Sequence, residues 1–126
     1  MRSDFQEKGK RWFGFGYACN GIKEVVKSEI NIKIHLIVAI IVLLLGFICQ
    51  LTRLEWVVLV LTIGSVLSLE MINTAIERLL DYLAPEVHPL VGIIKDISAG
   101  AVLVSAVIAV IIGCLLFLPK IVQLIL

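Results

Sequence analysis

The chain has 126 residues, of which 60% are hydrophobic and 17% are charged, and its mean hydropathy is +1.09. Ordinary soluble domains are nearer half apolar, so this composition argues against a soluble globular domain and indicates a single domain with the lipid bilayer as its solvent. The net charge is only +1, yet seven of the eleven Lys and Arg residues lie in the first 33 positions. By the positive-inside rule, this asymmetry predicts that the N-terminal region stays in the cytoplasm.

Residues 5–27 form the first predicted element. Apolar side chains, several of them aromatic, alternate there with Lys and Arg, which is typical of an amphipathic helix that lies on the membrane surface. Gly14, Gly16 and Gly21 disfavour a regular helix, since glycine is a poor helix former. The alternative is a partly irregular arm that packs on the rest of the chain.

Three hydrophobic segments follow, and each is predicted to be a membrane-spanning helix: residues 30–49, 56–83 and 95–118. The third is the clearest, because it has no charge from Ile97 to Leu118 and is followed by Pro119, which is expected to end it. A short connection predicts an antiparallel hairpin of the first two spans, and Pro85 and Pro89 indicate the turn before the third.

This layout predicts an all-α membrane protein with three transmembrane helices and a surface helix, because open polar backbone cannot survive in hydrocarbon. With the basic N-terminal region inside, residues 81–96 are also expected inside and the C-terminus outside. The sequence shows no repeat and no second domain, so residues 1–126 are expected to form one unit.

The second predicted span continues into a polar stripe made of Glu70, Asn73, Glu77 and Asp81. At about 100° per residue, the three acids fall within about 40° of one another on the helix, and Asn73 lies about 60° to one side. Ionisable groups at this depth of a membrane helix are costly and usually functional. The alternative is a solvated end of a long helix, but the remaining positions there stay apolar, which favours a stripe facing a cavity or a neighbouring helix.

Clustered carboxylates repel one another unless a cation lies among them. Hard oxygen ligands at an open site suit Mg²⁺ that carries phosphates. Glu29, at the entry of the first span, could add an oxygen from a facing helix, or could instead pair with Lys27 or Lys33 at headgroup level.

Further candidates lie around the expected turn and the start of the third span. Lys95 and Asp96 stand at a predicted helix N-terminus, where backbone donors and a lysine favour an anionic phosphate. Glu86 and His88 lie in the preceding loop, where His88 could bind a nucleotide or be an ordinary loop residue. The common P-loop and protein-kinase signatures are absent, so phosphoryl transfer here would need another scaffold.

Three segments together resemble a known family. They are the run from Glu70 to Asp81 (EMINTAIERLLD), the run from Pro85 to Leu90 (PEVHPL) and the run from Lys95 to Val102 (KDISAGAV). In order, spacing and three-span layout, nearly the whole chain resembles the small prokaryotic membrane diacylglycerol kinases and their Gram-positive undecaprenol kinase branch.

The resemblance implies a lipid kinase that transfers the γ-phosphoryl group of MgATP to the hydroxyl of a membrane lipid, in a homotrimer with sites between neighbouring chains. It implies Glu70 as the general base and Asn73 as a positioning group, with Glu29 and Glu77 binding Mg²⁺. The residues that it implies for holding the nucleotide are Lys95, Asp96, Glu86, His88, Tyr17 and Lys10, with Arg11 as the alternative to Lys10. The expected location is the plasma membrane of a bacterium, with a multi-pass chain, a cytoplasmic active site and no nucleic-acid partner.

The run Ser98-Ala99-Gly100-Ala101-Val102 is more similar to the undecaprenol kinases than to the diacylglycerol-specific members, so undecaprenol is the favoured acceptor and diacylglycerol the alternative. A small proton-coupled transporter could use Glu70 as its proton site, but it would not need the acids and Lys95 at the cytoplasmic side. A noncatalytic membrane subunit is the third possibility, and it predicts no ATP turnover by the purified chain.

Overall fold

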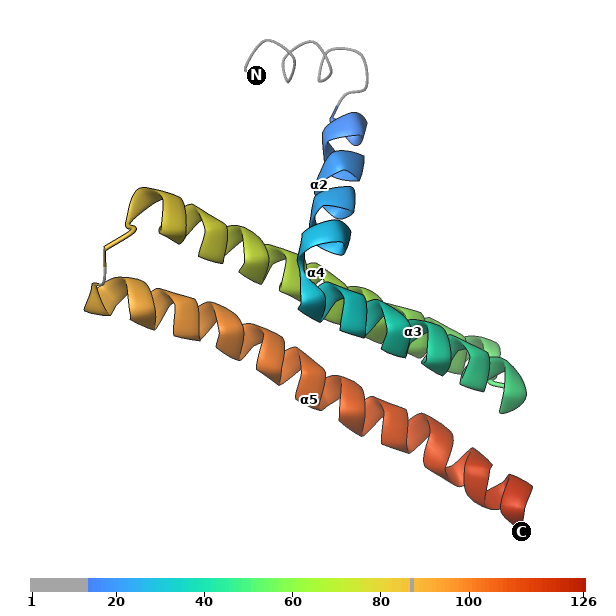
Figure 1. Ribbon diagram of the computed structural model, residues 1–126. Coiled ribbons are helices and arrows are strands. Elements are labelled where there is room, and N and C mark those ends of the chain that lie inside the picture. Colours follow the sequence, from blue (N-terminus) through green and yellow to red (C-terminus); the bar gives the residue numbers. More distant parts are fainter. Residues whose placement is uncertain (1–13, 87) are drawn as a thin grey trace.

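The computed structural model describes residues 14–86 and 88–126, and this part of the chain contains four helices and no strand. In chain order they are α2 (Phe15–Ser28), α3 (Ile30–Ile48), α4 (Arg53–Leu83) and α5 (Pro89–Ile125). Figure 1 shows α3, α4 and α5 running roughly along one direction, with α2 projecting away from them. The predicted all-α fold is thus confirmed, whereas Lys10, Arg11 and the start of the predicted 5–27 helix lie outside the described residues.

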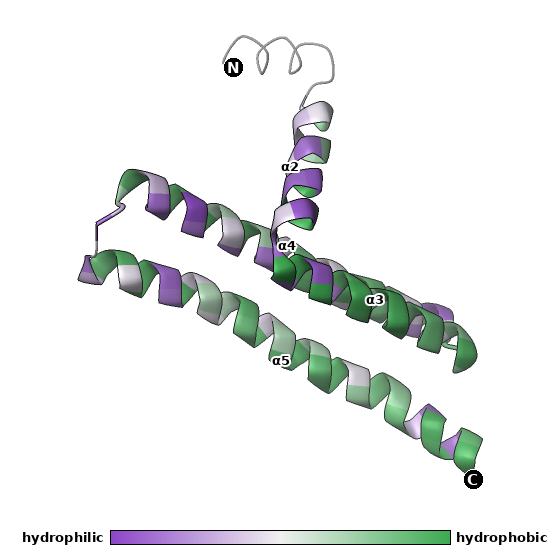
Figure 2. Cartoon of the chain, viewed as in Figure 1, coloured by the Kyte–Doolittle hydropathy of each residue, from purple (hydrophilic) through white to green (hydrophobic). Residues whose placement is uncertain are grey.

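Helices α3, α4 and α5 are each long and apolar enough to cross a membrane. They contain 19, 31 and 37 residues, so at 1.5 Å per residue α4 and α5 are about 47 and 56 Å long, well beyond the ~30 Å of a hydrocarbon core. Figure 2 shows hydrophobic residues along most of these helices and hydrophilic ones gathered on α2 and toward the connection between α4 and α5. Large apolar side chains such as Phe47, Leu61 and Leu103 are exposed, which suits a chain covered by lipid or neighbouring subunits.

The turn between α3 and α4 is fixed by local interactions. Thr52 and Glu55 form a capping box, in which each side chain accepts a hydrogen bond from the other residue's backbone N–H, so α4 begins at Arg53, three residues before the predicted start of the span. Gln50 adopts the left-handed conformation with φ 54°, which reverses the chain after Cys49. The adjacent buried core contains Cys49, Leu51, Leu59 and Phe117, so α5 also packs at this end of the bundle, which we call the α3–α4 end.

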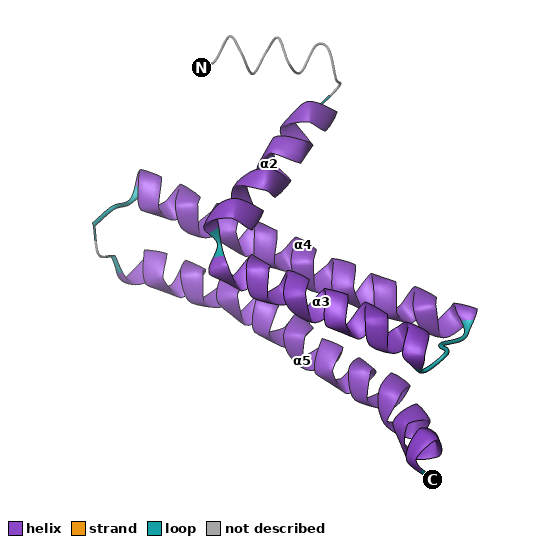
Figure 3. Ribbon diagram, turned by 45° about the vertical axis from the view of Figure 1, so that its right-hand side comes forward, coloured by secondary structure: helices purple, strands orange, loops and turns teal. Residues whose placement is uncertain are grey.

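Helix α5 extends beyond the predicted span 95–118 at both ends. It starts at Pro89, whose fixed φ suits the first helical position, and the Nδ1 of His88 caps it by accepting a hydrogen bond from the backbone N–H of Leu90 (3.1 Å). The prediction that Pro119 ends the helix is wrong, because the helix continues through it to Ile125. Beyond Pro119, the ion pair of Lys120 with Glu55 (3.1 Å) and the packing of Ile121 hold the last turns; Figure 3 shows α5 bending near its C-terminal end.

Helix α2 is separated from α3 by a single residue, Glu29, which has an extended conformation (φ −105°, ψ 118°). Gly14, with φ 86°, precedes the first turn of α2, while Gly16 and Gly21 lie within the helix. The prediction of a helix is therefore confirmed for residues 15–28, while its position on a membrane surface stays a prediction. The break at Glu29 lets α2 leave the direction of α3 (Figure 1). It also places Glu29 near the last turns of α4. We call the end of the bundle where α4 connects to α5 the α4–α5 end.

Candidate functional site

The predicted polar stripe on α4 is partly buried between α3 and α5. The side chain of Glu70 is only 5% exposed, and Asn73 and Thr74 are also buried. Helical periodicity places Glu70, Asn73 and Glu77 on one side of α4, and packing of the neighbouring helices then covers that side. The solvated helix end, considered as the alternative for this stripe, does not describe Glu70 or Asn73.

Asn73 is the centre of a short hydrogen-bond network. Its Oδ1 accepts a hydrogen bond from the hydroxyl of Ser98 on α5 (2.8 Å), and its Nδ2 donates to Oε1 of Glu77 (3.2 Å). Because both ends of the amide are engaged, its orientation is fixed, and so is the position of the Glu77 carboxylate one turn along the helix. Buried networks of this kind hold their members rigidly when all are satisfied.

Glu70 faces α3 rather than α5. Its Oε2 lies 3.9 Å from Nε2 of His35, while the hydroxyl of Thr74 donates to the backbone carbonyl of Glu70 (3.0 Å). The carboxylate therefore has an imidazole on one side and the Asn73 network on the same helix one turn away.

Glu29 is held by a cation that the sequence reasoning did not consider. One guanidinium nitrogen of Arg78 donates to Oε1 of Glu29 (2.9 Å) and to the hydroxyl of Ser28, and the other donates to Oε1 of Glu24 (3.2 Å). The partner of Glu29 is thus Arg78 and not Lys27 or Lys33. This Arg78 clamp, made of Arg78 with Glu24, Ser28 and Glu29, ties the α2–α3 junction to α4 two turns from Glu70.

Asp81, the last member of the stripe, pairs with α5. The Nζ of Lys95 lies 2.6 Å from Oδ1 of Asp81, so Lys95, which was expected only on the same side of the membrane as the stripe, contacts its last member. Asp96 is exposed on the next position of α5. Through Lys95 and Ser98, one face of α5 contacts the stripe at two points one turn apart.

The remaining candidates are Glu86, His88, Tyr17 and Lys10. Glu86 and His88 are exposed at the α4–α5 end, and His88 uses Nδ1 to cap α5. Tyr17 is half-buried in the first turn of α2. Lys10 lies outside the described residues, as does its alternative, Arg11.

A family model described as "Prokaryotic diacylglycerol kinase" matches residues 16–117. The chain belongs to the prokaryotic diacylglycerol kinase family. The undecaprenol kinase of Bacillus subtilis (strain 168) is 44% identical over 118 residues, which cover 93% of this chain and 96% of that protein. The diacylglycerol kinase of Synechocystis is 36% identical over 87% of this chain and 63% of its own length, and that of Escherichia coli (strain K12) is 27% identical over 80% of this chain and 83% of its own length.

Membership of the prokaryotic diacylglycerol kinase family confirms the resemblance inferred from the sequence and the expectation of a lipid kinase. It also disfavours the transporter and the noncatalytic subunit, since the match covers α3, α4 and most of α5. The family match begins at residue 16, so it includes Tyr17 and every candidate site residue except Lys10.

Three side chains of this family member were not among the predicted site residues: Ser98, His35 and Arg78. Ser98 had a detectable signal, because it lies three residues after Lys95 and so shares a helix face with it. His35 and Arg78 gave no such signal, since their contacts depend on how α3 and α2 are aligned with α4.

The carboxylates of the stripe bear on whether a metal ion could be held here. In the described ranges 14–86 and 88–126, no three carboxylate, imidazole or thiol side chains lie close enough together to hold a metal ion. Glu77 is half-buried and carries one hydrogen bond from Asn73, which leaves oxygen lone pairs for a cation. One or two carboxylates with the rest of the shell from phosphates and water is the usual arrangement for Mg²⁺ on a nucleotide, so these residues fit an ion that arrives with ATP.

Proposed function

We propose that this protein transfers the γ-phosphoryl group of MgATP to the hydroxyl of undecaprenol in a bacterial membrane. In the reaction, the O–H bond of the alcohol breaks and its proton passes to the Glu70 carboxylate. A bond forms between the alcohol oxygen and the γ-phosphorus, and the bond from that phosphorus to the leaving ADP oxygen breaks. The name of the Bacillus subtilis relative, 44% identical over nearly all of both chains, supports undecaprenol.

The observation that carries the proposal is the buried carboxylate of Glu70 beside the fixed amide of Asn73. A base at this depth of a spanning helix meets a lipid alcohol where its hydroxyl naturally lies. Phosphoryl transfer needs little from a protein beyond positioning and charge neutralisation. The Ser98–Asn73–Glu77 network supplies the first of these.

Residues toward the α4–α5 end would hold the nucleotide. In this proposal Glu77 and Glu29 bind Mg²⁺, which neutralises phosphate charge when bound. Glu29 would exchange its partner Arg78 for the ion. Lys95 and Asp96, with Glu86, His88, Tyr17 and Lys10, bind ATP. The exposed positions of Asp96, Glu86 and His88 leave their side chains accessible to a soluble nucleotide.

The orientation and assembly follow from charge and from exposed surface. The α4–α5 end would face the cytoplasm, since most basic residues precede α3. Helix α2 would be part of the amphipathic helix on the membrane surface. A homotrimer with sites between neighbouring chains would cover part of the apolar surface that α3 and α5 expose. Light scattering on the purified protein in detergent tests this assembly, and a monomeric active species would contradict it.

The substrate is tested with radiolabelled ATP and purified protein in mixed micelles. Undecaprenol and diacylglycerol are offered separately and then together, and labelled lipid is measured after extraction. We expect labelled undecaprenol phosphate, with a higher kcat/KM for undecaprenol than for diacylglycerol. The reverse order would assign the diacylglycerol alternative, and no labelled lipid from either acceptor would refute the kinase.

A further inference from the structure

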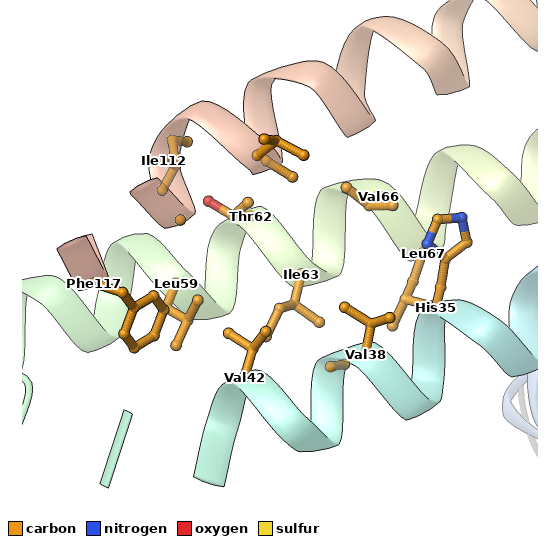
Figure 4. Close-up of a pocket in the computed structure, with 14 residues that line it drawn as sticks. His35, Val38, Val42, Leu59, Thr62, Ile63, Val66, Leu67, Ile112 and Phe117 are labelled. Carbon is orange, nitrogen blue, oxygen red and sulfur yellow. The ribbon is translucent and has the colours of Figure 1, made fainter. Parts of the chain in front are cut away.

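An apolar cavity of about 260 Å³ lies between α3, α4 and α5. Phe117 and Leu59 line it toward the α3–α4 end, and His35 lies at its other end (Figure 4). Two of its lining side chains are polar, Thr62 and His35. The hydroxyl of Thr62 already donates to the backbone carbonyl of Val58 (2.7 Å), whereas the imidazole of His35 is aimed at Glu70.

The contact between His35 and Glu70 is close but not yet a hydrogen bond. Its Nε2 to Oε2 distance is 3.9 Å, beyond the 2.7–3.2 Å range typical of hydrogen bonds. Such contacts in free enzymes often shorten when the substrate binds. Among the described residues, His35 is the side chain with which the structure pairs the Glu70 carboxylate.

The other charged groups near this level are already engaged or point elsewhere. Glu77 is bonded to Asn73, Glu29 to Arg78, and Lys95 to Asp81. Lys33, half a turn before His35 on α3, is exposed. An imidazole that is 28% exposed beside a carboxylate that is 5% exposed is therefore the group placed to control the orientation of Glu70.

We propose that His35 is a positioning residue for Glu70, donating from Nε2–H to Oε2 so that Oε1 is directed at the lipid hydroxyl. The inference rests on the proposed function and adds a residue that acts through the base. A buried carboxylate without this partner would rotate about its last torsion and spend less time aimed at the substrate. Orienting partners at metal sites typically change activity by roughly 10–100-fold, and the same range is expected here.

The test uses full-length protein in the lipid-phosphorylation assay, first with three single variants. His35→Leu should lower kcat by about 10–100-fold with the KM for MgATP changed less than twofold, because His35 is not among the residues proposed to bind ATP. His35→Gln should recover most of the rate, since its amide Nε2–H can replace the imidazole donor. Thr62→Val, which alters the same cavity wall away from Glu70, is the matched control and should stay within twofold of the wild type.

A double-mutant cycle with Glu70→Asp tests whether His35 acts through Glu70. In Glu70→Asp the carboxylate is one methylene shorter and withdrawn from the imidazole, so adding His35→Leu should lower the remaining rate less than twofold. Residues that act as one unit show this non-additivity. An equal loss in both backgrounds, or an unrescued His35→Gln, would overturn the proposal.

The outcome also separates the two proposals. A wild-type protein that phosphorylates neither lipid overturns the proposed function and this inference with it. An active wild type, with Glu70→Gln inactive and His35→Leu within twofold of normal, overturns the role of His35 alone. If His35→Leu does not fold, His35→Gln still tests the role of His35. A kcat of His35→Gln far below that of the wild type would overturn that role.

Discussion

From Glu70 to Leu83, α4 meets its neighbours through hydrogen bonds and ion pairs, whereas from Arg53 to Leu69 it meets them mainly through apolar side chains. The first set includes the Ser98–Asn73 bond, the Arg78 clamp and the Lys95–Asp81 pair. The second set is the core around Leu59 and Phe117 and the adjoining cavity between α3, α4 and α5. One continuous helix thus combines two kinds of environment.

The difference has a physical meaning. Burying a polar group is unfavourable unless it finds a partner, so the polar half of α4 is stable only because the α2–α3 junction, α3 and α5 supply partners beside it. The apolar half has no such requirement and depends on packing alone. Substitutions in the polar half should therefore change the rate and can also lower stability, whereas those in the apolar half should change stability and leave the rate unaltered.

Glu70→Gln gives the largest expected effect. It keeps the shape of the side chain but cannot accept the proton, so kcat should fall by about 10²–10⁴-fold while MgATP binding is retained. Glu77→Gln should lower the rate and also weaken MgATP binding, because Glu77 is proposed to bind the ion. Turnover and nucleotide titration on the same preparations measure both, and near-normal rates in the two variants would show that these roles are misassigned.

Ser98→Ala has the next largest expected effect on the rate. It leaves the buried Oδ1 of Asn73 without its donor, which costs about 1–3 kcal/mol and loosens the amide that positions Glu77. We expect kcat to fall roughly tenfold. Ser105→Ala is the control, since that hydroxyl donates only to the carbonyl of Val102 on its own helix; equal losses in both variants would mean that the Asn73 bond is unimportant.

The two ion-paired ends of α4 provide a third comparison. Arg78→Met removes the cation beside Glu29 and frees the α2–α3 junction, so we expect a change of roughly threefold in the KM for MgATP, as suits exposed pairs. Lys120→Met removes the pair with Glu55 at the opposite end and should leave KM unchanged. Steady-state kinetics at low and high salt distinguish them, and a KM change in Lys120→Met alone would reverse the comparison.

The sequence predicted the features that depend on one helix at a time. The spacing of Glu70, Asn73 and Glu77 required only the helical repeat, and three long apolar segments required only composition. The roles of these residues came from the family resemblance and remain predictions to be tested by substitution.

Features that depend on two helices were missed. His35 meets Glu70, and Arg78 meets Glu29, because α3 and α4 are antiparallel in a particular register that no single segment specifies. Pro119 was expected to end α5, since proline lacks the N–H that a helix needs. Packing of Ile121 and the Lys120–Glu55 pair hold the following turn, so tertiary contacts override the local rule.

Gly46→Ala, on α3, tests the packing against the apolar half of α4. A Cβ at this position would lie 2.7 Å from Cη2 of Trp56 and 3.1 Å from Cδ1 of Leu51, so the indole, which also packs on Phe47, must move. Overpacking of this kind costs about 1–3 kcal/mol, measured as a lower thermal midpoint in detergent, with kcat unchanged. Gly64→Ala, where a Cβ meets nothing within 4 Å, should not lower the midpoint; if it does so equally, the clash at Gly46 is not the cause.

Gln50→Gly has the smallest expected effect and the opposite sign. Gln50 holds φ 54° at the turn between α3 and α4, and the left-handed conformation disfavours a residue with a Cβ by about 1–2 kcal/mol. Glycine removes that penalty but adds freedom to the unfolded chain, so the net stabilisation should be about 0.5–1 kcal/mol, with kcat unaltered. Gln50→Ala separates the causes, because alanine keeps the Cβ and should give no gain. If alanine stabilised the protein as much as glycine, loss of the glutamine side chain, and not relief of the backbone, would be responsible. Either result locates the effect at the α3–α4 end, where packing and turn geometry set stability without reaching the polar half of α4.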